Sequence, residues 1–225
     1  MKIGIISDIH GNLRALEAIL EYFRKLNVDT IISLGDNIGY YHQSIEVLDL
    51  IKEKNIFTIM GNHEAYLIRK LECSDEKWRI IFLQNLKENL SNKELNWISN
   101  FPLTYEINTD SSKIALFHGS PWNPLEEYIY PNSEKINNFN NLPWDYIFLG
   151  HTHISMLKKL ENKYIINPGS CGQSRDGDLR ASAITIDTYS NDISFIKENY
   201  EIQLTIKEAI NSGVSEEAIK KLKGE

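Results

Sequence analysis

The chain has 225 residues, of which 42% are hydrophobic and 24% are charged. This composition is typical of a globular protein that is large enough to bury a sizeable core. Lysine and arginine together number 24, against 31 aspartates and glutamates, so the formal net charge is −7. A surface that binds DNA or RNA carries clustered lysine and arginine. The charge balance therefore argues against a nucleic-acid-binding protein.

No apolar run in the sequence approaches the ~18–20 residues needed to span a bilayer. The first expected strand begins at residue 2, which leaves no room for a signal peptide. Cys73 and Cys171 lie far apart and match no metal-binding or redox spacing, so we expect two reduced thiols. Together these features predict a cytoplasmic protein without a membrane partner.

The first third of the chain alternates strand and helix patterns. Apolar β-type runs at 2–7, 30–34 and 56–60 predict three strands. Apolar residues at helical spacing lie between them, and Asn12 is a candidate N-cap of the first helix. The two apolar faces consist of Leu13, Leu16, Leu20 and Phe23, and of Ile45, Leu48 and Ile51. This order predicts a parallel sheet with crossover helices.

Residues from about 64 to 101 show helical patterns only. Ser91 and Glu94 have the spacing of a capping box, and Pro102 ends the last of these helices. We interpret the segment as a helical insertion packed beside the sheet. The alternative interpretation is a lid that shapes access to a nearby site.

Strand patterns resume after this insertion. They cover 103–107, 113–117, 146–149, 155–160, 164–167, 181–187 and 193–200, and a long loop is expected at 120–131. Short polar connections between neighbouring runs indicate antiparallel pairing, so the second half is expected to form a second, mixed sheet. Two short helices follow, separated by Gly213, with Ser215 as the N-cap of the second. We expect one domain over residues 1–200, with 201–225 as a helical tail packed on it.

Five short motifs end or follow the expected strands and hold five of the six histidines. They are Asp8-Ile9-His10, Gly35-Asp36-Asn37, Gly61-Asn62-His63-Glu64, His118-Gly119 and Gly150-His151-Thr152-His153. Imidazole and carboxylate together suit Zn²⁺, Mn²⁺ or Fe²⁺. Seven candidate ligands exceed the needs of one ion but suit two ions that share a bridging carboxylate. The seven are Asp8, His10, Asp36, Asn62, His118, His151 and His153.

The order D-x-H, G-D, G-N-H-E, H and G-H-x-H resembles that of the calcineurin-like metallophosphoesterase family. It runs from residue 8 to residue 153, and the stretch 167–172 extends the likeness over most of the chain. The sequence is most similar to the small bacterial and archaeal phosphodiesterases of that family. The resemblance implies an α/β fold of the α+β kind, a four-layer α/β/β/α sandwich of two mixed sheets flanked by helices.

The resemblance also implies roles for the motif residues. The first metal would be bound by Asp8, His10 and His153, the second by Asn62, His118 and His151, and Asp36 would bridge the two ions. His63 would act as an acid outside the coordination sphere. Apart from the resemblance, the neighbouring Glu64 is a candidate to orient the His63 ring. We expect two divalent transition-metal ions, manganese first, with iron, nickel or zinc as alternatives. Bound cations would also make a local site positive on an acidic protein.

Two further residues are candidates for substrate binding. The protein-phosphatase branch of the family has Asp-Arg-Gly shortly after G-D, but here Asn37-Ile38-Gly39-Tyr40 follows Asp36. This difference weighs against a protein phosphatase, and it makes Asn37 a candidate contact to substrate. Arg175 lies in a glycine-rich stretch and is a candidate phosphate clamp. The alternative for Arg175 is a surface ion pair with an aspartate in an ordinary turn.

The expected function is hydrolysis of small phosphodiesters by attack of a metal-activated hydroxide on phosphorus, with His63 protonating the leaving group. A phosphomonoesterase or a nucleotide pyrophosphohydrolase could use the same centre. A nuclease is disfavoured because the chain lacks a basic stripe. A non-enzymatic protein-binding module, such as the family's retromer subunit, is a further alternative, but all eight motif positions are intact here.

Overall fold

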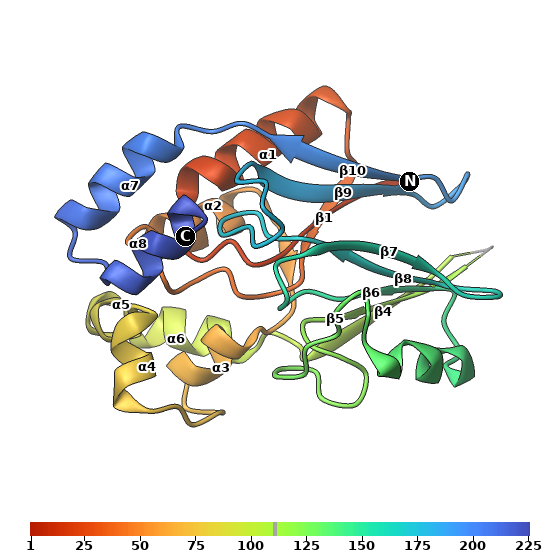
Figure 1. Ribbon diagram of the computed structural model, residues 1–225, viewed down its shortest axis with the longest axis horizontal. Helices are drawn as coiled ribbons and strands as arrows, with labels where there is room; N and C mark the ends of the chain where they lie inside the picture. The colour runs from red at the N-terminus through yellow and green to blue at the C-terminus, as the bar shows by residue number, and fades with distance from the viewer. Residues whose placement is uncertain (110–111) are drawn as a thin grey trace.

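The computed structural model describes residues 1–109 and 112–225, and its central feature is a pair of five-stranded sheets (Figure 1). The first sheet has the order β10-β9-β1-β2-β3, and the second β4-β5-β6-β8-β7. The strands are β1 (Lys2–Ile6), β2 (Thr30–Ser33), β3 (Phe57–Thr58), β4 (Thr104–Asn108), β5 (Lys113–Phe117), β6 (Tyr146–Phe148), β7 (Ser155–Lys159), β8 (Tyr164–Pro168), β9 (Ala181–Asp187) and β10 (Ile193–Glu198). Both sheets are mixed, and helices flank them, as the resemblance implies.

The last two strands differ from the expectation that the second half of the chain forms a sheet of its own. β9 pairs antiparallel with β1, with Gly4 opposite Thr185, and β10 pairs antiparallel with β9. The second sheet is completed instead by β4 and β7 as antiparallel edges around the parallel strands β5, β6 and β8. Short turns correctly indicate that β9 and β10 pair with each other, but they do not indicate which sheet the hairpin joins.

The described helices are α1 (Leu13–Lys25), α2 (Ser44–Glu53), α3 (Asn62–Leu67), α4 (Asp75–Ile80), α5 (Leu83–Asn89), α6 (Asn92–Ser99), α7 (Ile202–Asn211) and α8 (Glu216–Lys223), with a 3₁₀ helix η1 (Glu134–Asn141). Three of them, α1, α6 and α8, begin directly after the capping residues expected from the sequence. The side chains of Asn12, Ser91 and Ser215 accept N-capping hydrogen bonds, and Ser91 with Glu94 forms the predicted capping box. η1 covers the outer face of the second sheet and was not expected from the sequence.

Successive side chains along a strand point to opposite faces of the sheet, and this alternation separates the core between the sheets from the outer layers. Ile3 and Ile5 of β1 face the second sheet and pack with Ile114 and Leu116 of β5 in the core between the sheets. Ile6 faces outward and packs with α1 and α2, while Ala115 and Phe117 pack against η1. A one-residue change of register would exchange these faces, so the hydrophobic pattern fixes how each strand is seated.

The helices α3–α8 gather near the end of the sheets where β1 stops (Figure 1). Residues of α3, α5 and α6 share one hydrophobic cluster with residues of α7 and α8, for example Leu83 with Ala218. A shared core of this kind supports our proposal that the insertion at about 64–101 and the tail at 201–225 belong to the same domain as the sheets. None of the helices in the described part of the chain has the length and apolar character required to cross a bilayer.

Gly172 offers a test of how closely the segment after β8 packs on the loop after β1. A Cβ at this position would lie 1.8 Å from the backbone oxygen of Ile9, which cannot move aside without a shift of the main chain. We expect Gly172→Ala to lower the free energy of unfolding by about 3 kcal/mol, measured by urea denaturation. Gly177→Ala is the control, because no atom lies within 4 Å of its Cβ and only its positive φ is strained, at about 1 kcal/mol. Equal midpoints for the two variants would contradict the close packing.

Candidate metal centre

The motif loops come together because the parallel strands end at one edge. Hydrogen bonds of the β1–β2 type continue past the strands, from Asp8 N to Gly35 O and from His10 N to Asp36 O, each 3.0 Å long. Gly150 connects the last motif to the His118 motif, because the N–H of Gly150 donates to His118 O at 2.8 Å. The five loops thus meet at the carboxyl ends of the strands, where open α/β sheets place their sites.

Glu64 ties two of these loops together. Its buried carboxylate accepts hydrogen bonds from the backbone N–H groups of Asp36 (2.9 Å), Asn37 (2.8 Å) and Gly61 (3.0 Å). The sequence suggested Glu64 as the partner of the His63 ring, but that ring instead contacts the backbone oxygen of Ile38 at 3.1 Å. Glu64 therefore positions the backbone that carries Asp36, and it acts on the centre through that backbone.

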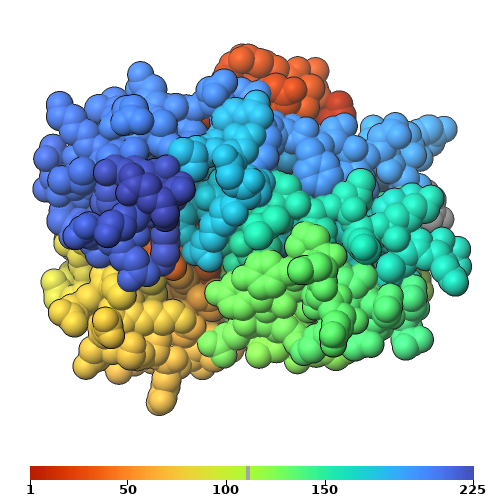
Figure 2. All heavy atoms as spheres, viewed as in Figure 1, coloured from red at the N-terminus to blue at the C-terminus, as the bar shows by residue number. Residues whose placement is uncertain are grey.

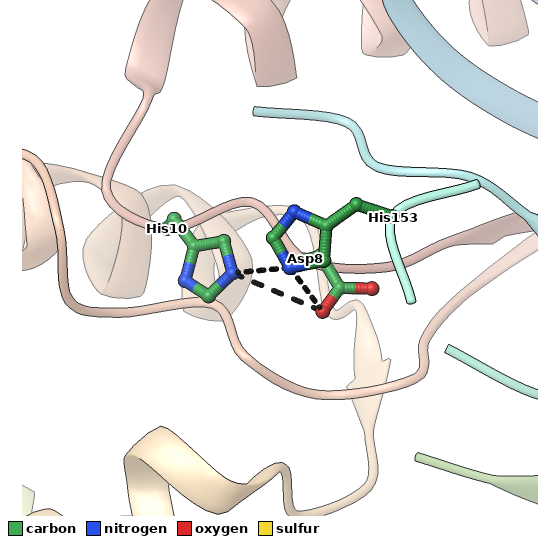
Figure 3. A group of neighbouring side chains, drawn as sticks. All are labelled: Asp8, His10 and His153. Atoms are coloured by element: carbon green, nitrogen blue, oxygen red, sulfur yellow. Dashed lines mark hydrogen bonds and ion pairs between the residues drawn. The ribbon is translucent and has the colours of Figure 1, made fainter. Parts of the chain in front are cut away.

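Asp8, His10 and His153 form the first cluster, and their side chains point toward one another (Figure 3). The Nε2 atoms of His10 and His153 lie 3.1 Å apart, and Asp8 Oδ1 lies 3.3 Å from His153 Nε2 and 3.8 Å from His10 Nε2. Asp8 Oδ1 is buried and has no hydrogen-bond partner in the described part of the chain. A buried carboxylate oxygen without a partner is costly unless a cation binds it.

Asn62, His118 and His151 converge in a second cluster. His118 Nε2 lies 2.9 Å from Asn62 Oδ1 and 3.1 Å from His151 Nδ1. Asp36 stands between the two clusters, with its Oδ2 atom 3.6 Å from His118 Nε2 and 3.8 Å from His10 Nε2. All seven candidate ligands are therefore brought together, in the two groups that the family resemblance implies.

The tautomers of three rings fix which atoms face inward. The Nδ1 atoms of His10, His118 and His153 lie 3.2, 2.9 and 2.6 Å from the backbone oxygens of Ile38, Leu34 and Gln173. A carbonyl oxygen only accepts, so each neutral ring carries its proton on Nδ1 and directs the Nε2 lone pair inward. Lone pairs that face each other at about 3 Å repel, and a shared cation removes the repulsion. Backbone-oriented imidazoles of this kind are typical of metal ligands.

Burial disfavours the charged forms of His10, His151 and His153 and opposes ionisation of the carboxylates. It lowers the pKa of His10 and His153 well below the usual range, and that of His151 to about 2. Burial also raises the pKa of Asp8 to about 7, and that of Asp36 well above its usual value. Neutral imidazole is the form that binds metals, and a divalent cation would stabilise the buried carboxylates. The residues present therefore fit a pair of divalent cations.

The backbone at the centre is strained. Asp8, His10, Asp36, His151 and His153 all adopt left-handed conformations, with φ between 53° and 66°. Such conformations are uncommon for residues other than glycine and cost of order 1 kcal/mol or more each. They persist only where the surrounding structure holds them, and they cluster at functional sites.

His63 lies within reach of the first cluster. Its ring is 4.6 Å from that of His10, and its Nε2 atom is 3.8 Å from Asp36 Oδ2. His10, Asp36 and His63 form a group whose ligand atoms all lie within 4.8 Å of one another. The geometry is therefore compatible with a metal ligand as well as with the acid suggested by the sequence, and experiment must separate the two roles.

The two candidate substrate contacts have different surroundings. Asn37 is buried, and its side chain is occupied by Ser33, Thr58 and Glu64. Arg175 is exposed, donates to Gln173 Oε1 at 2.7 Å, and takes part in none of the ion pairs between described residues. The neighbouring aspartates pair with other cations, Asp176 with Lys197 and Asp178 with Arg180.

Two aromatic side chains beside the centre, Tyr40 and Tyr128, are not part of the sequence motifs. The Tyr40 ring lies 4.8 Å from that of His10 and 5.0 Å from that of His63. Tyr128 stacks on His151 with 3.8 Å between ring centroids. Their only sequence signal is proximity, because Tyr40 follows the G-D motif and Tyr128 lies in the aromatic-rich loop after His118.

Comparison with known proteins places this geometry in a family. The model of the calcineurin-like phosphoesterase superfamily domain matches residues 1–191. The protein MJ0912 of Methanocaldococcus jannaschii is 31% identical over 233 aligned residues, covering 95% of this chain and 94% of that protein. Phosphodiesterase MJ0936 of the same organism is 28% identical over 176 residues, covering 76% and 84%.

A solved structure agrees with the sequence relatives. The crystal structure of a metallophosphoesterase from Sphaerobacter thermophilus is 31% identical to this chain, with a TM-score of 0.85. The match covers 100% of this chain and 99% of that one. These comparisons confirm the resemblance seen in the motifs: the chain belongs to the calcineurin-like phosphoesterase superfamily.

Proposed function

We propose that the protein hydrolyses small phosphodiesters at a centre of two divalent metal ions. The observation that carries the proposal is the convergence of two ligand clusters on Asp36, with imidazole lone pairs directed inward. Asp8, His10 and His153 would bind one ion, and Asn62, His118 and His151 the other. When bound, such ions bring the pKa of water to about 7 and polarise a phosphoryl oxygen.

Side chains of the protein would perform the remaining steps, which are binding of the phosphoryl group and protonation of the leaving group. Arg175 is exposed and donates to Gln173 Oε1, and its positive charge acts on Asp8 and Asp36 against the larger effect of burial. In this proposal it binds a phosphoryl oxygen, because a planar donor pair suits a phosphate. His63 is held through Nδ1 by Ile38 O, so Nε2 is the atom that would carry a proton to the leaving oxygen.

Protonation of His63 needs a nearby anion. Burial lowers the pKa of its ring well below the usual range. A phosphate group beside Nε2 adds negative charge, which favours the imidazolium form. In this proposal the acid is thus formed only when substrate is present.

The diesterase assignment is supported by a relative named as a phosphodiesterase. A phosphomonoesterase or pyrophosphohydrolase remains the alternative, because the same ligand set serves both. The metal identity is proposed as manganese, with iron, nickel or zinc as alternatives, since imidazole and carboxylate suit all four.

Metal dependence is the first test of this function. Chelation should abolish hydrolysis of bis(p-nitrophenyl) phosphate, and Mn²⁺ or a similar ion should restore it. Asp36→Ala should lower the content of both metals because the carboxylate faces both clusters, whereas His153→Ala should chiefly lower one. Metal per chain is measured by mass spectrometry of the purified variants.

Asp49→Ala is the matched control, since that carboxylate lies on the surface of α2. It should keep both metals and full activity. Undiminished turnover in a metal-free protein would contradict the proposal.

His63→Gln separates the acid from a ligand. If His63 is the acid, the variant keeps its metals while kcat falls about 10²–10⁴-fold. The loss should be smaller for p-nitrophenyl esters, whose leaving group needs little protonation, than for alkyl esters. Bound metal and kcat are measured together on both kinds of ester. Loss of one metal in step with activity would instead identify His63 as a ligand.

A small substrate, rather than a polynucleotide, is proposed from the net charge of −7. Proteins that neutralise several phosphates lose affinity steeply as salt rises. Fluorescence anisotropy should therefore detect no tight binding of duplex or single-stranded DNA at about 50 mM salt. Tight binding with a steep salt dependence would refute this part of the proposal.

A further inference from the structure

The loop after β5 presents two tyrosines at the surface beside the candidate metal centre. Leu125 and Ile129 of this loop are buried, with exposed fractions of 7% and 1%. Tyr128 and Tyr130, on either side of Ile129, are 44% and 40% exposed. Buried neighbours thus anchor the backbone while two large rings are left facing solvent. In Figure 2 this green part of the chain adjoins the yellow helical segment and the cyan segment after β8.

The two rings continue a stack that begins at a candidate metal ligand. Tyr128 lies against His151 with a centroid distance of 3.8 Å and an interplanar angle of 24°. Tyr130 is nearly parallel to Tyr128, at 5.8 Å and 6°. A centroid distance of this size between parallel rings means that they are offset. Part of each ring face is therefore left open to a third planar group.

Hydrogen bonds fix the conformation of the loop. The N–H of Gly119 donates to Pro124 O at 2.7 Å, and that of Ser120 donates to Asn123 O at 3.0 Å. The Ser120 hydroxyl donates to Glu127, whose carboxylate also pairs with Lys135 of η1. A preformed platform loses little conformational entropy when a ligand binds.

The platform is close to the position where a phosphate would lie. Tyr128 stacks on the His151 ring, and the Nδ1 atom of that ring lies 3.1 Å from His118 Nε2 in the second cluster. The Tyr128 ring therefore lies directly against a candidate ligand of the second ion. A phosphoester bound at the two ions would carry one of its ester groups beside the tyrosines.

A structural role in covering the His151 ring would explain the position of Tyr128 but not that of Tyr130. Tyr128 stacks directly on that ring, whereas Tyr130 stacks on Tyr128. Two exposed parallel rings are what a planar substrate group requires, because every nucleobase can stack on an aromatic side chain. The acidic chain disfavours long polyanions. We propose that Tyr128 and Tyr130 bind the base of a small nucleoside phosphoester, an inference that rests on the proposed function and specifies its substrate.

The test compares two esters with the same leaving group. One is the p-nitrophenyl ester of thymidine 5′-monophosphate, and the other is methyl p-nitrophenyl phosphate, which has no base to stack. Stacking contributes about 1–3 kcal/mol per base, so Tyr130→Leu should raise KM for the thymidine ester about tenfold. It should leave kcat for this ester, and both constants for the methyl ester, unchanged. Tyr130→Phe keeps the ring and should behave as wild type.

Tyr189→Leu is the matched control, because Tyr189 is 92% exposed and lies on the β9–β10 turn. It should change neither KM. Equal effects of Tyr130→Leu on the two esters, or no effect on either, would overturn the stacking subsite. Bound metal is measured in each variant, and Tyr130→Leu should keep the wild-type content.

A binding measurement separates this inference from the proposed activity. Calorimetry on the metal-loaded protein compares adenosine 5′-monophosphate with inorganic phosphate. We expect the nucleotide to bind at least tenfold more tightly, and Tyr130→Leu to remove the difference. If this result is obtained but neither ester is hydrolysed, the subsite stands and the proposed activity fails. If both esters are hydrolysed but the two ligands bind equally in wild type and variant, the activity stands and the subsite is refuted.

Discussion

Glu64 lies fully buried at the start of α3. Its two carboxylate oxygens accept hydrogen bonds from three backbone N–H groups that belong to two different loops. Hydrogen bonds to a charged group contribute about 1.5–3 kcal/mol each, and a buried carboxylate without them would be costly. The loop after β2 and the turn into α3 are thereby locked together. Asp36 and Asn62 depend on this contact for their relative positions.

This connection between the two loops matters because the groups that form the centre repel one another when no cation is present. Inward lone pairs, two buried carboxylates and five left-handed residues all oppose folding at this edge. The contributions that favour folding come from the hydrophobic layers behind the centre. Apolar side chains pack between the sheets and on both outer faces, and they hold the strand ends in place whether or not the loops are relaxed.

Much of the fold and of the candidate ligand set could be predicted because their signals are local. Runs of apolar β-type residues located the strands, and capping side chains such as Asn12 and Ser91 located helix starts. The destination of β9 and β10 could not be predicted, since pairing between Gly4 and Thr185 depends on tertiary packing. The interactions of Glu64 and Asn37 were missed for the same reason. A side chain's partners across loops leave no periodic pattern in sequence.

The pairing of β1 with β9 has a consequence for the order of events during synthesis. β1 is the central strand of its sheet, yet one of its two neighbours is made about 180 residues later. Contacts so distant in sequence form slowly, because a long loop must close first. The first strand therefore leaves the ribosome with one edge unpaired. Asp8 follows this strand directly, and its proposed co-ligand His153 is synthesised much later. The set of proposed ligands is complete only after residue 153 has been synthesised, and β9, which pairs with β1, follows at residues 181–187.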